Sequence, residues 1–106
     1  MTSFVQSLIP EIHSTLAAIY GNRLVKLLLY GSQARGDADT GSDVDVLVVL
    51  HGQVDPCEEI LRVSEATSHL SLAYDTVISC LFMQEERYLH ENSPLLMNIR
   101  REGMVI

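Results

Sequence analysis

Apolar residues recur about every four positions over the first twenty residues, and this spacing predicts an amphipathic helix. Pro10 is comfortable only in a first helical turn, so the helix is expected to begin or kink there, and Gly21-Asn22 is a typical stop. A mostly apolar run over residues 24–30 then predicts a strand that is covered on both faces. The stripe of the predicted helix consists of Phe4, Leu8, Ile12 and Leu16, with Ile19 or Tyr20 next.

After Gly31 the pattern changes to a turn and then to regular alternation. Residues 33–35 are expected to form a short helical turn capped by Ser32, and residues 36–42 have the composition of a loop. Over residues 43–50, alternate positions fall on the two faces of a predicted second strand. One face carries Val44, Val46, Val48 and Leu50, and the other carries Asp43, Asp45, Leu47 and Val49.

The second half of the chain predicts two helices and one strand. Asp55 can cap a helix that has Pro56 at its first position, and Glu58 completes a capping box. Residues 74–82 are rich in strand-forming residues, and Ser93-Pro94 begins a last helix that ends before Gly103. The order α-β-β-α-β-α predicts one compact α/β (α+β) domain over residues 1–106, with a small mixed sheet. The stripe of the helix after Pro56 consists of Ile60, Val63, Ala66 and Leu70.

Composition narrows the class of protein. A length of 106 residues suits one domain, and 47% apolar residues are enough for a packed core. The net charge of −7 argues against a nucleic-acid binder, which needs a basic face. The longest apolar runs are far shorter than the ~18–20 residues of a membrane span, and the N-terminus lacks the basic residues of a targeting signal. We therefore expect no membrane partner and a cytoplasmic location, with Cys57 and Cys80 as buried reduced thiols.

The segment from Gly31 to Leu50 contains the candidate chemistry. A glycine lets a ligand approach the backbone closely, and the free N–H groups at a helix start form a natural phosphate cradle beside the Ser32 hydroxyl. Taken alone, however, a Gly-Ser pair after a strand is more often an ordinary connection than a phosphate site. Asp43 and Asp45 lie two positions apart on a strand, so their carboxylates share a face and can hold the same cations. Two solvated aspartates at the start of a strand are the alternative.

A third carboxylate changes the balance between these interpretations. If the predicted third strand pairs beside the second, Asp75 joins Asp43 and Asp45 in a triad of acids able to hold two metal ions roughly 3.5–4 Å apart. An isolated aspartate at a strand edge is the alternative. An EF-hand loop beginning at Asp37 is excluded, since Ser42 stands where glycine is needed and Val48 where glutamate is needed. P-loop, Rossmann and nucleophile-elbow motifs are absent from the sequence.

The string GSQARGDADTGSDVDVLVVL resembles the signature of the polymerase β-type nucleotidyltransferase superfamily, and it is similar to the minimal nucleotidyltransferases of bacteria and archaea. The resemblance implies transfer of AMP from ATP to an acceptor hydroxyl with release of pyrophosphate. It implies that Gly31 and Ser32 hold the triphosphate, and that Asp43 and Asp45 hold metal. Asp75 then matches the third acid, which helps hold metal and takes the acceptor's proton. Arg35 contacts phosphate or pairs with Asp37 or Asp39.

The same resemblance implies cofactors and partners. Mg²⁺ is the expected metal in a two-metal site, with Mn²⁺ as a substitute. Family members of this length are often encoded beside a HEPN-domain protein, and some act as its antitoxin by attaching AMP to a tyrosine. Two other functions stay open: a binding module that occludes a partner without turnover, and a small-molecule nucleotidyltransferase. A homo-oligomer is also compatible with the sequence.

Overall fold

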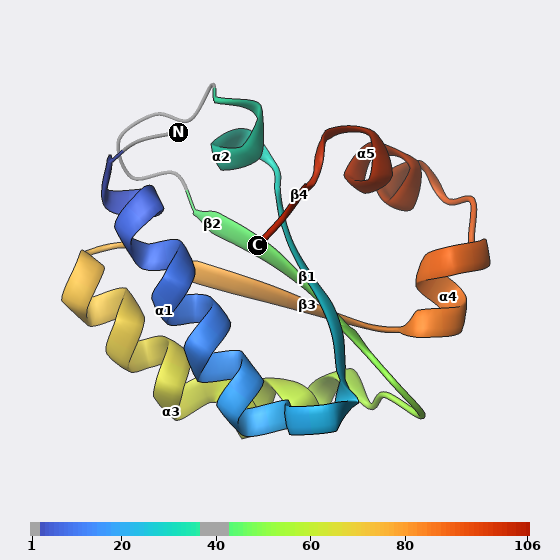
Figure 1. The fold of residues 1–106 in the computed structure, drawn as a ribbon, viewed down its shortest axis with the longest axis horizontal. Helices are drawn as coiled ribbons and strands as arrows, with labels where there is room; N and C mark the ends of the chain where they lie inside the picture. The colour runs from blue at the N-terminus through green and yellow to red at the C-terminus, as the bar shows by residue number, and fades with distance from the viewer. Residues whose placement is uncertain (1–2, 37–42) are drawn as a thin grey trace.

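The computed structural model describes residues 3–36 and 43–106 (Figure 1). The helices are α1 (Ser3–Tyr20), α2 (Ser32–Arg35), α3 (Pro56–Tyr74), α4 (Glu85–His90) and α5 (Pro94–Glu102), with a 3-10 turn η1 (Gly21–Arg23). The strands are β1 (Leu24–Tyr30), β2 (Val44–Leu50), β3 (Ile78–Gln84) and β4 (Met104–Val105). The predicted class, a mixed sheet flanked by helices, is confirmed.

The four strands form one sheet in the order β3-β2-β1-β4. β1 runs antiparallel to both β2 and β4, and β2 runs parallel to β3. The register places Tyr30 opposite Asp45 on one side of β2, and Ser79 beside Asp45 on the other side. The end of β1 and the start of β2 therefore meet at one end of the sheet, where the candidate acids lie.

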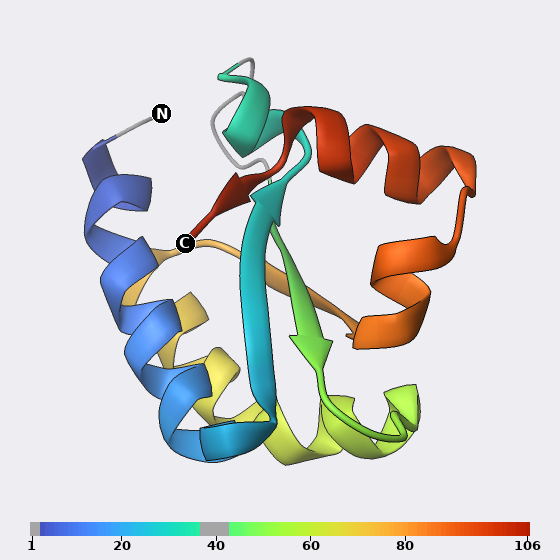
Figure 2. The same cartoon turned by 45° about the vertical axis from the view of Figure 1, so that its right-hand side comes forward.

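Helices cover both faces of the sheet, as the two views show (Figures 1 and 2). On one face, α1 and α3 pack against alternate residues of β2. On the other face, α5 contributes Leu96 and Ile99, which pack against Leu47 and Val49. The predicted alternation of β2 is confirmed, because each face of this strand supplies a separate core. The β2 residues that face α1 and α3 are Val44, Val46, Val48 and Leu50.

Helix α1 differs from its prediction at its beginning. It continues through Pro10, so no new start is needed there. Pro10 is exposed, which leaves the carbonyl that lacks an amide partner on the side where water can reach it. The buried stripe begins at Val5, and Phe4 is 37% exposed. The stripe prediction is correct from Leu8 onward and wrong by one residue in the first turn.

Helix α3 begins as predicted and ends later than predicted. The Asp55 carboxylate accepts hydrogen bonds from the backbone N–H groups of Cys57 (3.1 Å) and Glu58 (3.4 Å), which caps the helix. The helix continues to Tyr74, and Asp75 is its C-cap in the left-handed conformation at φ 50°. Its predicted stripe is only partly correct, since Ile60 is 52% exposed and Glu59 is buried in its place.

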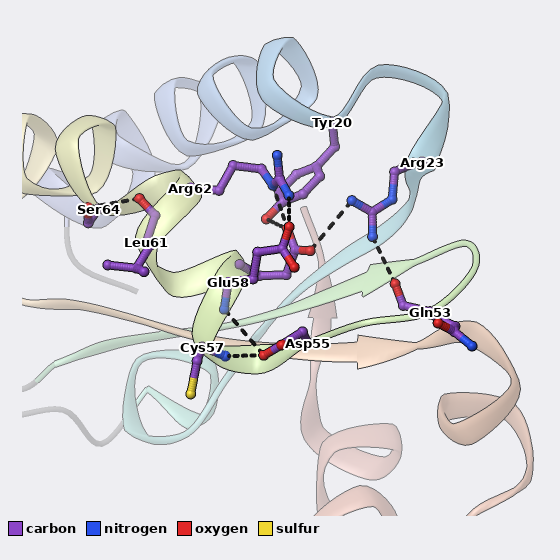
Figure 3. A network of polar contacts seen from close by, with 10 residues as sticks. Tyr20, Arg23, Gln53, Asp55, Cys57, Glu58, Leu61, Arg62 and Ser64 are labelled. Carbon is purple, nitrogen blue, oxygen red and sulfur yellow. Dashed lines mark hydrogen bonds and ion pairs between the residues drawn. The ribbon is translucent and has the colours of Figure 1, made fainter.

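At the end of the sheet away from the acid pair, a buried glutamate of α3 connects this helix with the end of α1, and Figure 3 shows its partners Tyr20, Arg23 and Arg62. Glu59 accepts hydrogen bonds from the Tyr20 hydroxyl (2.8 Å) and from Nε of Arg62 (2.9 Å), and Arg23 lies 3.5 Å away as an ion-pair partner. Burial acts to raise the pKa of Glu59, but these hydrogen bonds and cationic charges outweigh it and lower the pKa below its usual value. This charged network explains why a glutamate can take a core position on α3.

Other features separate the structure from the predictions. Helix α4 and strand β4 were not predicted. Cys57 is exposed at the start of α3, which contradicts its prediction as a buried thiol, and Cys80 is half-buried; both cysteines are free.

No helix among residues 3–36 and 43–106 has the length and apolar character needed to span a bilayer. Ser93 caps α5 as predicted, accepting a hydrogen bond from the Leu96 N–H at 3.3 Å.

Candidate active site

Gly31 lies in direct contact with the Asp45 carboxylate. Its backbone has φ 75° and ψ −158°, a region that only glycine adopts readily. A Cβ added at this position would stand 2.4 Å from Oδ2 of Asp45 and 3.3 Å from its Cγ. The glycine is therefore required twice over, by its conformation and by the acid against it. This contact brings the turn after β1 and the acid within β2 into one site.

The turn after Gly31 forms the short helix α2. The Arg35 N–H donates to the Gly31 carbonyl at 3.1 Å, and the Gly36 N–H donates to the Ser32 carbonyl at 3.0 Å. Gly31 is the N-cap, and Ser32 is the first helical residue. The prediction of Ser32 as a side-chain cap is therefore wrong, although the helical turn itself is confirmed. N–H groups in a first helical turn have no partner within the helix, so they are suited to bind oxygen atoms of an anion.

Asp45 lies on the face of β2 opposite to α1 and α3, because its neighbours Val44 and Val46 pack in the core beneath those helices. Asp43 is exposed just before β2, and Asp45 is half-buried within it. Burial and then the charge of Asp43 raise the pKa of Asp45, while the positive charge of Arg35 opposes them. Two carboxylates that repel each other in this way are a suitable site for a divalent cation, which relieves the repulsion.

Asp75 does not join this acid pair. The sequence predicted Asp75 within a third strand. Because the helix continues to Tyr74, Asp75 lies instead at the C-cap of α3. The β3 residue beside Asp45 is instead Ser79. Among the residues that the structure describes, no group of three or more histidine, cysteine, aspartate or glutamate side chains is placed to hold a metal ion. The predicted three-acid cluster is therefore not observed in the described chain.

Arg35 pairs with a residue that the sequence analysis did not single out. Its Nη1 lies 3.3 Å from Oε1 of Glu102, at the end of α5. The alternative partners Asp37 and Asp39 lie outside the described residues. No local pattern could have pointed to Glu102, because this contact joins residues 67 positions apart in the sequence.

Tyr30 is the second residue near the acids that sequence reasoning missed. It ends β1 opposite Asp45, and it packs with the core beneath α5. Burial and then the Asp45 charge raise the pKa of its phenol. Its position at the end of the predicted strand, directly before the glycine turn, was the available signal.

A separate polar hollow of about 730 Å³ lies at the opposite end of the sheet. Arg23, His51 and Gln84 are among its lining residues, and they lie near the start of β1 and the ends of β2 and β3. The glycine turn and the acid pair do not line it. The candidate chemistry therefore rests on the site at Gly31 and not on this hollow.

Comparison with known proteins identifies the family. A nucleotidyltransferase domain model matches residues 9–101. The chain belongs to the nucleotidyltransferase domain family. This nucleotidyltransferase is 34% identical over 99 residues to the "Putative protein adenylyltransferase MJ0604" of Methanocaldococcus jannaschii, a match that covers 92% of the chain and 93% of the relative. It is 36% identical over 72 residues to the similarly named MJ0141 of the same organism, covering 68% of the chain and 72% of that relative.

Solved structures share the fold of this nucleotidyltransferase. The "putative nucleotidyltransferase from Sulfolobus solfataricus" superposes with a TM-score of 0.61 at 18% identity, over 99% of this chain and 86% of that one. A toxin-antitoxin structure with AMP-PNP superposes with a TM-score of 0.64 at 21% identity, over 91% of this chain and 69% of that one. A complex of a tri-AMPylated Shewanella oneidensis HEPN toxin with MNT antitoxin superposes with a TM-score of 0.60 at 19% identity, over 94% of this chain and 69% of that one. The predicted polymerase-β-like nucleotidyltransferase fold is thereby confirmed.

Proposed function

We propose that this nucleotidyltransferase transfers AMP from ATP to a hydroxyl of a partner protein, a tyrosine of a HEPN-domain protein, as its antitoxin in the cytoplasm. The contact between Gly31 and the Asp45 carboxylate carries the proposal, because a turn suited to bind phosphate and an acid suited to bind a metal ion then lie together. The adenylyltransferase names of the M. jannaschii relatives support AMP as the transferred group. The AMPylated toxin in one neighbouring structure supports a protein acceptor.

Two groups of residues take part in the reaction: the turn after Gly31 binds phosphate, and the acid pair binds metal. N–H groups of the turn after Gly31, with the Ser32 hydroxyl, hold phosphate oxygens of ATP. Asp43 and Asp45 hold Mg²⁺, or Mn²⁺ in its place. Two carboxylates suffice because Mg²⁺ commonly takes one or two carboxylates and completes its shell with substrate phosphates and water. When bound, the metal neutralises charge that develops on the phosphate oxygens.

The transfer forms one P–O bond, breaks another and moves one proton. The acceptor oxygen bonds to the α-phosphorus of ATP, the bond from this phosphorus to pyrophosphate breaks, and the hydroxyl proton passes to a carboxylate. Asp45 is the described acid nearest the turn, so we assign the proton to the Asp43 and Asp45 pair. The role of Asp75 as a third acid, which the family resemblance implied, draws no support from its place at the end of α3.

Labelled ATP provides the test. The chain, [α-³²P]ATP and Mg²⁺ are incubated with the protein encoded beside it, and that protein is expected to become labelled. The double variant Asp43→Asn, Asp45→Asn should not label it, and Asp75→Asn should label it at the original rate. Equal labelling by the double variant would disprove the proposed reaction. Neutralisation of the neighbour without any label would indicate a binding module that acts by occlusion.

A further inference from the structure

An open sheet edge lies close to the acid pair. β3 is the outer strand beside β2 in the described sheet. The Val44 N–H donates to the Val77 carbonyl at 2.8 Å, so in the parallel pattern Val77 and Ser79 direct their backbone groups toward β2. Ile78 and Cys80 consequently direct theirs away from the sheet. These outward groups can pair with an added strand.

A groove runs along this edge between β3 and α3. Its volume is about 300 Å³, and the described residues that line it are apolar or carry hydroxyl or thiol groups, with no charged side chain. Ile60 on α3 is 52% exposed in the wall of the groove, and Thr67 and Ser68 continue the wall toward the end of the helix that lies near the acids. An extended peptide could pair with the outward backbone of β3 and place alternate apolar side chains in the groove.

The same edge leads to the catalytic acids. Ser79 stands beside Asp45 in the register, and both side chains share one face of the sheet. Because serine is small, a long side chain from an added strand can pass over it toward Asp45. Docking at this edge would therefore bring an acceptor hydroxyl toward the acids.

We propose that the edge of β3 and the adjoining face of α3 dock an extended segment of the protein acceptor, which adds to the sheet as a strand and presents its hydroxyl across Ser79 to Asp45. The proposal rests on the proposed function, since it names the surface that selects a protein acceptor. Charge favours a partner with basic residues over a second copy of this chain. Each copy carries a net charge of −7, and Asp43, Asp45 and Asp75 lie near the end of the groove at which β3 begins.

The test combines a groove variant with a matched control. Ile60→Glu puts a charge into the groove, whereas Leu61→Glu puts the same charge on a neighbouring residue that is 76% exposed and does not line it. Binding of the co-encoded protein is measured by calorimetry, in the background of the Asp43→Asn, Asp45→Asn variant so that no transfer occurs. Ile60→Glu should weaken binding at least about tenfold, and Leu61→Glu should leave it unchanged. Circular dichroism melting checks that both variants fold.

Amide hydrogen exchange gives a second measurement that does not depend on a substitution. On mixing with the co-encoded protein, the outward amides of Ile78 and Cys80 should gain protection. Unchanged exchange at β3 in the complex, equal binding by Ile60→Glu, or no complex at all would each overturn the docking surface. Transfer by the original chain with equal labelling by Ile60→Glu would overturn the surface and leave the transferase standing. If Ile60→Glu abolished binding but the original chain transferred no AMP, the docking surface would stand and the transferase would be overturned.

Discussion

Replacing Gly31 by alanine tests the contact that defines the site. The substitution adds one methyl group at φ 75°, where its carbon would lie 2.4 Å from Oδ2 of Asp45. Ordinary van der Waals contact begins near 3.4 Å, so the carboxylate and the turn must separate by about 1 Å. We expect both the stability and the chemistry to change.

The two costs differ in size and in origin. A non-glycine residue in this backbone region costs about 1–3 kcal/mol, and about 1 kcal/mol shifts the melting temperature of a domain this small by roughly 4 °C or more. A displacement of about 1 Å at a reacting centre can lower a rate about 100-fold. Gly31→Ala should therefore melt at a lower temperature and lose nearly all AMP transfer.

Gly52→Ala is the control for strain alone. Gly52 also has a positive φ, of 78°, but an added Cβ would meet no atom within 4 Å. This variant should lose stability and keep its transfer rate. Scanning fluorimetry measures both melting temperatures, and labelled ATP measures transfer at a temperature where both variants are folded. If Gly31→Ala transfers AMP as fast as Gly52→Ala, the Gly31–Asp45 contact does not define the active site.

Three further outcomes follow from the charges and burial of the structure. Asp45→Asn removes a carboxylate whose pKa is raised by burial and by the charge of Asp43. In scanning fluorimetry this variant should therefore be as stable as the original chain or more stable without metal, and Mn²⁺ should not stabilise it further. A loss of stability without metal would contradict the repulsion between the two carboxylates. Glu59→Gln should cost about 1.5–3 kcal/mol at neutral pH in urea unfolding, since hydrogen bonds to a charged group are lost. The folded pKa of Glu59 is lowered, so its stabilisation is present above its ordinary value of 4.5 and disappears as the pH falls through the folded pKa; a constant difference between the two proteins at all pH values would refute this. Iodoacetamide should modify exposed Cys57 in the folded protein well before Cys80, whose pKa burial raises to about 11, as peptide mass spectrometry can show; equal rates would contradict that burial.

The strands around the site were the most predictable part of the fold. β1 has the bounds that its apolar run predicted, and the alternation over β2 separated the two cores correctly. β2 is buried over most of its length and β1 at its centre, from Leu27 to Leu29, so their patterns directly reflect their surroundings. The Gly31-Ser32 turn and the Asp43 and Asp45 pair were predictable for a related reason. Their spacing is local, and the strands that hold them are regular.

The errors occur where distant contacts override local preference. Tyr74 was predicted in a strand because of its β propensity, but its hydroxyl donates to the Ser7 carbonyl at 3.4 Å and to the Glu11 carboxylate, which ties the end of α3 to α1. Aspartate tolerates the left-handed conformation better than most residues, so Asp75 can end the helix. The buried Glu59 similarly depends on partners from α1 and η1, which no periodicity within α3 can reveal.

Strand β2 has consequences for how the enzyme should fail. From Val46 to Leu50 each side chain is wholly buried, alternately in one hydrophobic cluster and in the other. Asp45 directly precedes Val46 in this strand, so loosened packing on either side of the sheet shifts the same acid of the candidate site. Catalysis thus reports on the integrity of both layers at once. On gradual heating, AMP transfer should decline before the circular dichroism of the helices does, whichever of the two hydrophobic clusters loses its packing first.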